Sequence, residues 1–87
     1  MPGVARVGDT SDHGGTVITG ASISFANGIP IARVGDLHEC PQQGHGTTEI
    51  VTGSPSVNVE GQPVARIGDS VGCGAVLTSG SPDVNAG

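Results

Sequence analysis

The sequence predicts an all-β fold, a small cone in which three similar β-hairpin units form a ring around a pseudo-three-fold axis. Three observations predict it: a hexapeptide that occurs three times, turn dipeptides between short strand-like segments, and the lack of any long stretch with apolar residues at helical spacing. The 87 residues are expected to form one domain, residues 1–87, without an extension domain.

The hexapeptide is the most informative of these features. Its copies begin at Val4, Ile31 and Val64, and each reads Val/Ile-Ala-Arg-Val/Ile-Gly-Asp. The chain has no Lys, and its only three Arg residues occupy the same position in the three copies. Chance does not explain that placement, so the hexapeptide marks three equivalent positions in the fold.

A second repeated element, which begins with Gly, divides the chain into three units. Two of them are continuous and span 20–52, with 33 residues, and 53–79, with 27 residues. The third begins at 80–87 and continues at the other terminus through 1–19, again 27 residues in all. Linear solenoids stack their repeats and cap the ends. A repeat that runs from the C-terminus into the N-terminus instead predicts a closed ring with adjacent termini.

Each unit is expected to contain a hairpin. Asn27-Gly28 and Glu60-Gly61 are turn dipeptides, and Gly readily adopts the positive φ that tight hairpin turns require. Because side chains alternate along a strand, one set of equivalent residues should face inward. That set is small or apolar in all three units: Ser24, Val57, Val84, Ala26, Val59 and Ala86.

The outward-facing set is polar except at two positions. Ile23 and Phe25 stand where the other units carry Ser, Asp or Asn. Two interpretations are open. Either these residues form a docking patch at the base of the cone, which we favour, or the first strand is shifted by one residue and buries them.

Composition limits how such a chain can be stabilised. Hydrophobic residues make up 34% of the chain and one residue is aromatic, which is little for a domain of this size. A domain with so thin a core needs a disulfide, a metal ion or a partner.

Charge and terminal sequence narrow the function classes. A net charge of −5 without Lys argues against nucleic acid as a partner, because no basic surface can neutralise phosphates. The N-terminus lacks the apolar run of a cleavable signal peptide. No segment approaches the about 20 apolar residues of a membrane-spanning helix.

All His and Cys residues lie in the three segments that follow the hexapeptides. His13 and Cys73 each come four residues after the hexapeptide's Asp, and the middle segment, six residues longer, contains His38, Cys40 and His45. Structural zinc takes four N or S ligands. We therefore predict one zinc ion held by His13, His38, His45 and Cys73, with Cys40 left over. A disulfide between Cys40 and Cys73 is the structural alternative.

These repeats resemble the proline-alanine-alanine-arginine repeat (PAAR) family over essentially the whole chain. The hexapeptide is preceded by Pro30 and Pro63 in two copies, whereas Gly3 stands there in the first. The second Ala of the family name is present in every copy, and Val or Ile replaces the first.

The resemblance implies a cone seated on the blunt, trimeric end of the VgrG spike of the type VI secretion system. It also implies a zinc ion near the apex held by three His and one Cys, which fits His13, His38, His45 and Cys73. On this basis the protein is expected to be the structural tip that sharpens the spike for membrane puncture and effector delivery.

The expected partners are one trimeric VgrG-type spike per tip, with effectors and a transiently touched target membrane as further candidates. No small-molecule substrate and no catalytic residue are expected. A catalytic zinc keeps one coordination position open beside a substrate pocket, whereas four protein ligands would fill all positions of this ion. The tip would be cytoplasmic on the assembled spike and translocated on firing. The alternative is a stand-alone interaction module stabilised by zinc or a disulfide.

Overall fold

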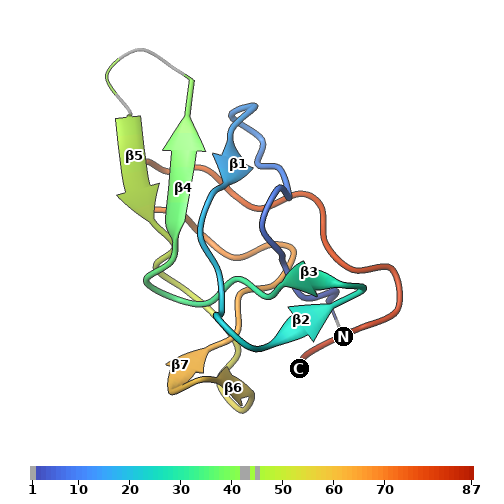
Figure 1. The fold of residues 1–87 in the computed structure, drawn as a ribbon. Helices are drawn as coiled ribbons and strands as arrows, with labels where there is room; N and C mark the ends of the chain where they lie inside the picture. Colours follow the sequence, from blue (N-terminus) through green and yellow to red (C-terminus); the bar gives the residue numbers. More distant parts are fainter. Residues whose placement is uncertain (1, 42–43, 45) are drawn as a thin grey trace.

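The computed structural model describes residues 2–41, 44 and 46–87, so the predicted ligand His45 lies outside the described residues. The described part of the chain is all-β, as predicted, and consists of short strands joined by turns (Figure 1). The strands are β1 (Thr16–Val17), β2 (Phe25–Ala26), β3 (Ile29–Pro30), β4 (Leu37–Cys40), β5 (Gly46–Glu49), β6 (Asn58–Val59) and β7 (Gln62–Pro63). They form one three-stranded sheet, in the order β1-β4-β5, and two hairpins, β2-β3 and β6-β7.

The three hexapeptides meet in a closed triangle of backbone hydrogen bonds, which confirms the predicted ring. The N–H of Ala5 donates to the carbonyl of Ala65 at 2.9 Å, that of Ala65 to Ala32 at 3.0 Å, and that of Ala32 to Ala5 at 2.9 Å. All three side chains are completely buried. Only a small side chain lets three backbones approach one axis this closely, so the Ala of the hexapeptide follows from the ring itself.

The third hairpin closes across the two ends of the chain. Gly3 pairs with Asn85 in an antiparallel bridge, and the N–H of Ala86 donates to the carbonyl of Pro2 at 3.0 Å. Figure 1 shows both ends on the same side of the molecule as the hairpins β2-β3 and β6-β7. We call this side the broad end.

Both predicted turn dipeptides form the tight turns of these hairpins. Asn27 and Gly28 have φ of 56° and 78°, and Glu60 and Gly61 have φ of 50° and 84°. Positive φ at both central residues is the conformation of a type I′ turn, whose twist matches that of the flanking strands. Asn adopts this region with little strain, whereas Glu does so only rarely.

The buried apolar side chains form two clusters, one above the other along the cone. The cluster at the broad end contains Val4, Ala26, Ile31, Val64 and Ala86, with Val59 half-buried against it. The central cluster contains Ala5, Val17, Ala32, Ile50, Ala65, Val71, Ala75 and Leu77.

The predicted strand alternation is right at one set of equivalent positions and wrong at another. Ala26 and Ala86 are buried and Val59 is half-buried, as expected. Val57 and Val84, which were expected to face inward, are 39% and 37% exposed. The reason is the length of the strands: β6 is only two residues long and begins after Val57. The alternation therefore does not extend back to that position.

Ile23 and Phe25 are both exposed, at 79% and 56%. Phe25 lies in β2 with its side chain outward, and the next residue, Ala26, is buried. The alternative of a strand shifted by one residue is therefore wrong.

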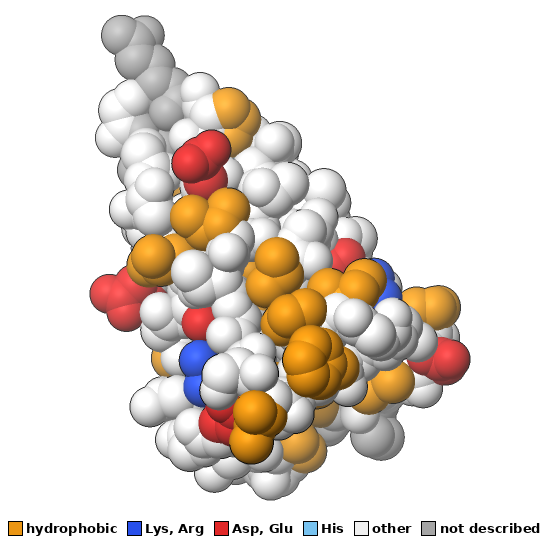
Figure 2. Space-filling view, in the orientation of Figure 1, with side chains coloured by type: hydrophobic (Ala, Val, Ile, Leu, Met, Phe, Trp, Pro, Cys, Tyr) orange, Lys and Arg blue, Asp and Glu red, His pale blue; other side chains and the backbone are white. Residues whose placement is uncertain are grey.

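The molecule narrows away from the broad end, as the space-filling view shows (Figure 2), and measures 32 × 24 × 22 Å. The hairpin β4-β5 extends towards this narrow end (Figure 1). It contains the extra residues of the middle unit, which have no counterpart in the other two units. Along β4, Leu37 and Glu39 are exposed while His38 and Cys40 are buried, which is the alternation of a strand with one covered face.

Candidate metal centre

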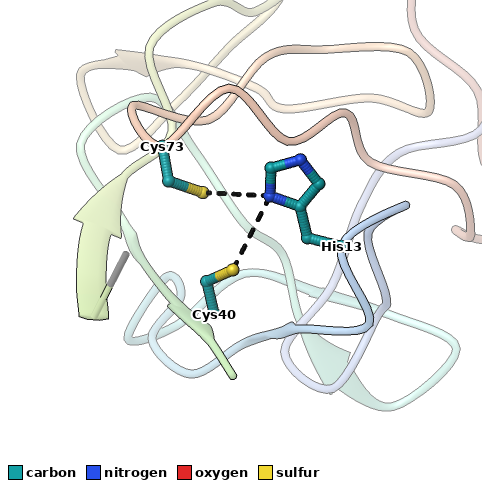
Figure 3. A group of neighbouring side chains, drawn as sticks. All are labelled: His13, Cys40 and Cys73. Atoms are coloured by element: carbon teal, nitrogen blue, oxygen red, sulfur yellow. Dashed lines mark hydrogen bonds between the residues drawn. The ribbon is translucent and has the colours of Figure 1, made fainter. Parts of the chain in front are cut away.

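Three donor side chains converge at the narrow end, one from each unit: His13, Cys40 and Cys73 (Figure 3). Each stands four residues after the Asp that ends its hexapeptide, so the three positions are equivalent in the ring. The Nδ1 atom of His13 lies 3.6 Å from the Sγ of Cys40 and 3.8 Å from the Sγ of Cys73. All three donor atoms lie within 4.8 Å of one another.

Two short loops with the same turn carry two of these donors. The loops span 10–16 and 70–76, and a bridge between their first and last residues closes each one. The donor is followed in both by a Gly at positive φ, Gly14 at 79° and Gly74 at 91°. A residue with a side chain would be strained at this φ, so Gly is what turns the chain sharply after the ligand.

The donor geometry suits a tetrahedral metal ion. Ligands bonded to zinc at about 2.0–2.3 Å lie about 3.4–3.8 Å from one another, close to the two separations measured here. Cys40 is buried at 4% exposed, and Cys73 packs against the central apolar cluster. Neither cysteine is disulfide-bonded. The group can therefore hold a metal ion through one imidazole and two sulfur atoms.

The PAAR-motif family model matches residues 7–79 of the 87-residue chain. The chain belongs to the PAAR-motif family. The resemblance seen in the repeats is thus confirmed, and we refer to the three hexapeptides as PAAR repeats. Proteins of this family are structural components of the type VI secretion spike rather than known enzymes. A search of curated proteins found no match to the chain.

His38 lies in a layer below the donor group of this PAAR protein. It is completely buried, and its Nε2 is 2.8 Å from the Oγ of Ser11. Within the described residues, its Nδ1 has no hydrogen-bond partner. Burial lowers the pKa of His38, and the nearby His13 lowers it further, so the ring is held neutral. A Cβ at Gly15 would lie 2.6 Å from the imidazole, so only Gly leaves room for it.

The structure thus brings together two of the four predicted ligands, His13 and Cys73. His38 lies in the layer below, and the described residues do not include His45. Cys40, which the sequence left over, is the third member of the group, and it lies four residues after Asp36 as His13 and Cys73 lie after theirs. Counting back from Gly53 points to His45 instead, because the six extra residues of the middle unit displace that count.

The Asp of each PAAR repeat fixes the turn that leads into the donor-bearing segment. Its Oδ2 accepts a hydrogen bond from the Nε of the repeat's own Arg at 3.0 Å in all three copies. The same oxygen accepts the backbone N–H of that Arg at 2.7–2.8 Å. These Asp side chains are 6–9% exposed, so the pairs are far less solvated than surface ion pairs.

A hydroxyl from the neighbouring segment donates a further hydrogen bond to each Asp carboxylate. The three bonds run from Thr19 to Asp36 at 2.9 Å, from Thr52 to Asp69 at 3.0 Å and from Ser79 to Asp9 at 2.8 Å. Each of these three carboxylates thereby ties two parts of the ring together.

The described part of the chain contains no helix with the length and apolarity needed to cross a membrane.

Proposed function

We propose that this PAAR protein is the tip of a type VI secretion spike, which binds the blunt end of a trimeric VgrG-type protein and sharpens it. The observation that carries the proposal is the closed triangle of Ala5, Ala32 and Ala65, which makes the whole molecule pseudo-three-fold. A partner with three identical chains can then meet three similar hairpins at once, which a monomer without internal symmetry does not offer.

The broad end is the surface we assign to docking. It carries the hairpins β2-β3 and β6-β7 and the paired chain ends, one hairpin for each unit. Ile23 and Phe25 add an exposed apolar patch to one of them. Hydrophobic side chains are visible over this part of the surface in Figure 2.

The ion we propose is a single structural zinc. It would tie together two loops and the hairpin β4-β5 at the narrow end, where the cone has too little width for a conventional core. One zinc per chain, measured by elemental analysis, tests this assignment. On this proposal the protein acts through its pointed shape, which aids membrane puncture and effector delivery, and no side chain is catalytic.

The test of docking is a double variant, Ile23→Asp with Phe25→Asp, mixed with a trimeric spike of the same bacterium. The wild type should form a complex of one tip and three spike chains, detected by its mass. We expect the variant to bind at least about tenfold more weakly, because it removes apolar area and places two charges at the contact. Folding and zinc content should not change, since both side chains are exposed.

The pseudo-symmetry supplies a matched control. Ser56 and Asn58 are the equivalents of Ile23 and Phe25 in the next unit; Asn58 lies in β6 and Ser56 two residues before it. Ser56→Asp with Asn58→Asp therefore adds the same charge without removing apolar surface. It should weaken binding less. Equal binding by the wild type and the Ile23/Phe25 variant would remove these residues from the docking surface. A protein that binds no trimeric spike would favour the stand-alone interaction module.

On the same proposal the tip is cytoplasmic while the spike is assembled and leaves the cell with it on firing. Detection of the untagged protein with an antibody, in cells and in the medium, tests that route when strains with and without a functional secretion apparatus are compared.

A further inference from the structure

We propose that the outer face of the sheet β1-β4-β5 binds one basic amphipathic helix of a partner protein. The three strands stand side by side on the flank of the cone (Figure 1). We call their exposed surface the flank face. The hairpins of the broad end are not part of it, so the inference does not depend on spike binding.

The flank face combines apolar and acidic side chains. Leu37 pairs with Glu49 across β4 and β5, and on the other side it accepts the N–H of Ile18 through its carbonyl at 2.9 Å. Ile18 and Leu37 are 42% and 37% exposed, and Val51, two residues after Glu49, is 53% exposed. Glu39 is the next outward residue along β4. Figure 2, in the same orientation, shows hydrophobic and acidic side chains next to one another over these strands.

This apolar row breaks the pseudo-symmetry of the ring. Equivalent pairs of residues stand at the three unit boundaries: Ile18 and Leu37, Val51 and Ser70, and Thr78 and Thr10. In each pair the N–H of the first residue donates to the carbonyl of the second at 2.8–2.9 Å. The third pair shows that the fold accepts Thr at both positions, so Ile18 and Leu37 are not required to form it. A three-fold partner meets three equal surfaces, whereas a surface that occurs once fits a single partner chain.

The charge of the flank face indicates the charge of its partner. The three Arg residues are the only Lys or Arg of the chain, and each is bonded to the Asp of its own repeat. In the described residues, the one further ion pair of an Arg joins Arg33 to Glu60. Glu39 and Glu49 are therefore not neutralised by any Arg, and both are exposed. Two carboxylates beside an apolar row favour a partner with Lys or Arg beside its own apolar residues.

Both edges of the sheet are already bonded to other parts of the chain. On the β1 side, the N–H of Val17 donates to the carbonyl of Asp9 at 3.0 Å. On the β5 side, the N–H of Gly72 donates to the carbonyl of Glu49 at 2.8 Å. A partner therefore meets the face of the sheet and not an edge. Three strands about 4.8 Å apart present a row about 10 Å long, close to two turns of a helix, whose own backbone needs no partner.

An NMR titration with designed peptides tests this assignment. The probe is a soluble helical peptide with Leu along one side and Lys next to it. Its controls are a scrambled sequence of the same composition and a version with Glu in place of Lys. We expect the amides of Ile18, Leu37 and Val51 to shift with the basic peptide only. Glu39→Lys with Glu49→Lys should weaken binding of the basic peptide by at least about tenfold and allow the acidic peptide to bind.

The repeats provide variants that should keep the fold. Ile18→Thr with Leu37→Thr copies the pair at the third boundary, so it should abolish the shifts and leave the melting temperature close to that of the wild type. The matched control is Thr78→Ser with Thr10→Ser, which changes the equivalent residues of that boundary and should bind the peptide as the wild type does.

Several results would overturn the proposal. One is a set of shifts that centres on Ile23 and Phe25 at the broad end, and another is equal binding of the scrambled peptide. A wild type that sediments as a dimer and becomes monomeric in the Ile18/Leu37 variant would make a second copy the occupant of the face. A protein that binds the basic peptide at the flank face but no spike would remove only the proposed function.

Discussion

The broad and narrow ends of the cone are stabilised in different ways. At the broad end, apolar side chains such as Ile31 and Val64 pack beneath the hairpins, and backbone pairing closes the ring across Gly3 and Asn85. At the narrow end two loops and the hairpin β4-β5 bring together polar and sulfur-containing side chains. A cone offers width for a hydrophobic cluster at one end only. The comparison indicates that contacts between donor side chains replace apolar packing where the diameter becomes small.

Removing a donor at the narrow end should have the largest effect. His13→Ala is expected to lower the free energy of unfolding by more than about 4 kcal/mol, because losing a structural metal is among the most damaging single changes. Thermal unfolding with and without a chelator measures it, and the exposed Thr47→Ala at the same end is the control. If a chelator leaves the wild-type melting temperature unchanged, the narrow end is held by something other than an ion.

The hydrogen-bonded Ala triangle between the two ends should be the next most sensitive region. Ala65 is completely buried within the hydrogen-bonded triangle, so Ala65→Leu forces three carbons into a space without room for them. We expect a loss of about 3 kcal/mol in urea unfolding. Val57→Leu, at a position 39% exposed, is the control and should change little. Equal stability of the two variants would show that the axis is less tightly packed than the backbone bonds indicate.

The buried carboxylates that join segments should rank third. Asp36→Ala removes the bonds from Arg33 and from the Thr19 hydroxyl and should cost about 2 kcal/mol. Glu39→Ala, an exposed acid three residues further along, should be close to neutral. Chemical denaturation of both variants in parallel gives the comparison, and similar losses would mean that the Asp36 bonds add nothing to the turn.

Glu60 at the broad end should give the smallest effect, one that depends on pH. Its carboxylate accepts hydrogen bonds from the N–H of Ile23 at 3.0 Å and from the Ser22 hydroxyl at 2.9 Å. In the other two units a Ser hydroxyl accepts the equivalent backbone N–H: Ser54 accepts that of Ser56 at 3.2 Å, and Ser81 accepts that of Asp83 at 3.3 Å. The middle unit has Ala21 at this position, so Glu60 supplies the missing acceptor.

These bonds, the one from the Ile23 N–H first, lower the pKa of Glu60 from 4.5 to about 2. The folded protein thus binds this proton less readily than the unfolded chain. The stabilising contribution is complete above about pH 4.5 and is lost as the pH falls from there towards 2. An NMR titration of the Glu60 carboxyl should show the low pKa, and Glu60→Gln should remove that part of the pH dependence. A pKa near 4.5 would contradict the contact.

The ring and its turns could be predicted from the sequence because repetition makes each unit a test of the others. The hexapeptide, the turns at Asn27 and Glu60 and the joined ends all follow from comparing equivalent positions. The hairpin β4-β5 could not be found this way, since its extra residues have no counterpart in the other units. The same insertion displaces the count that leads to Cys40, whose neighbours His13 and Cys73 lie far away in sequence and come beside it only in the folded chain.

The pairing of Gly3 with Asn85 means that the order of the units along the polypeptide is not what defines the fold. A peptide link between the two ends would keep the existing hydrogen bonds and add a third tight turn, much like the one at Glu60 and Gly61. The backbone could then be opened at that turn, or at Asn27 and Gly28, without separating any strand from its neighbour. The molecule is topologically a circle cut once, and circular permutants that begin at any of these three points should reach the same cone.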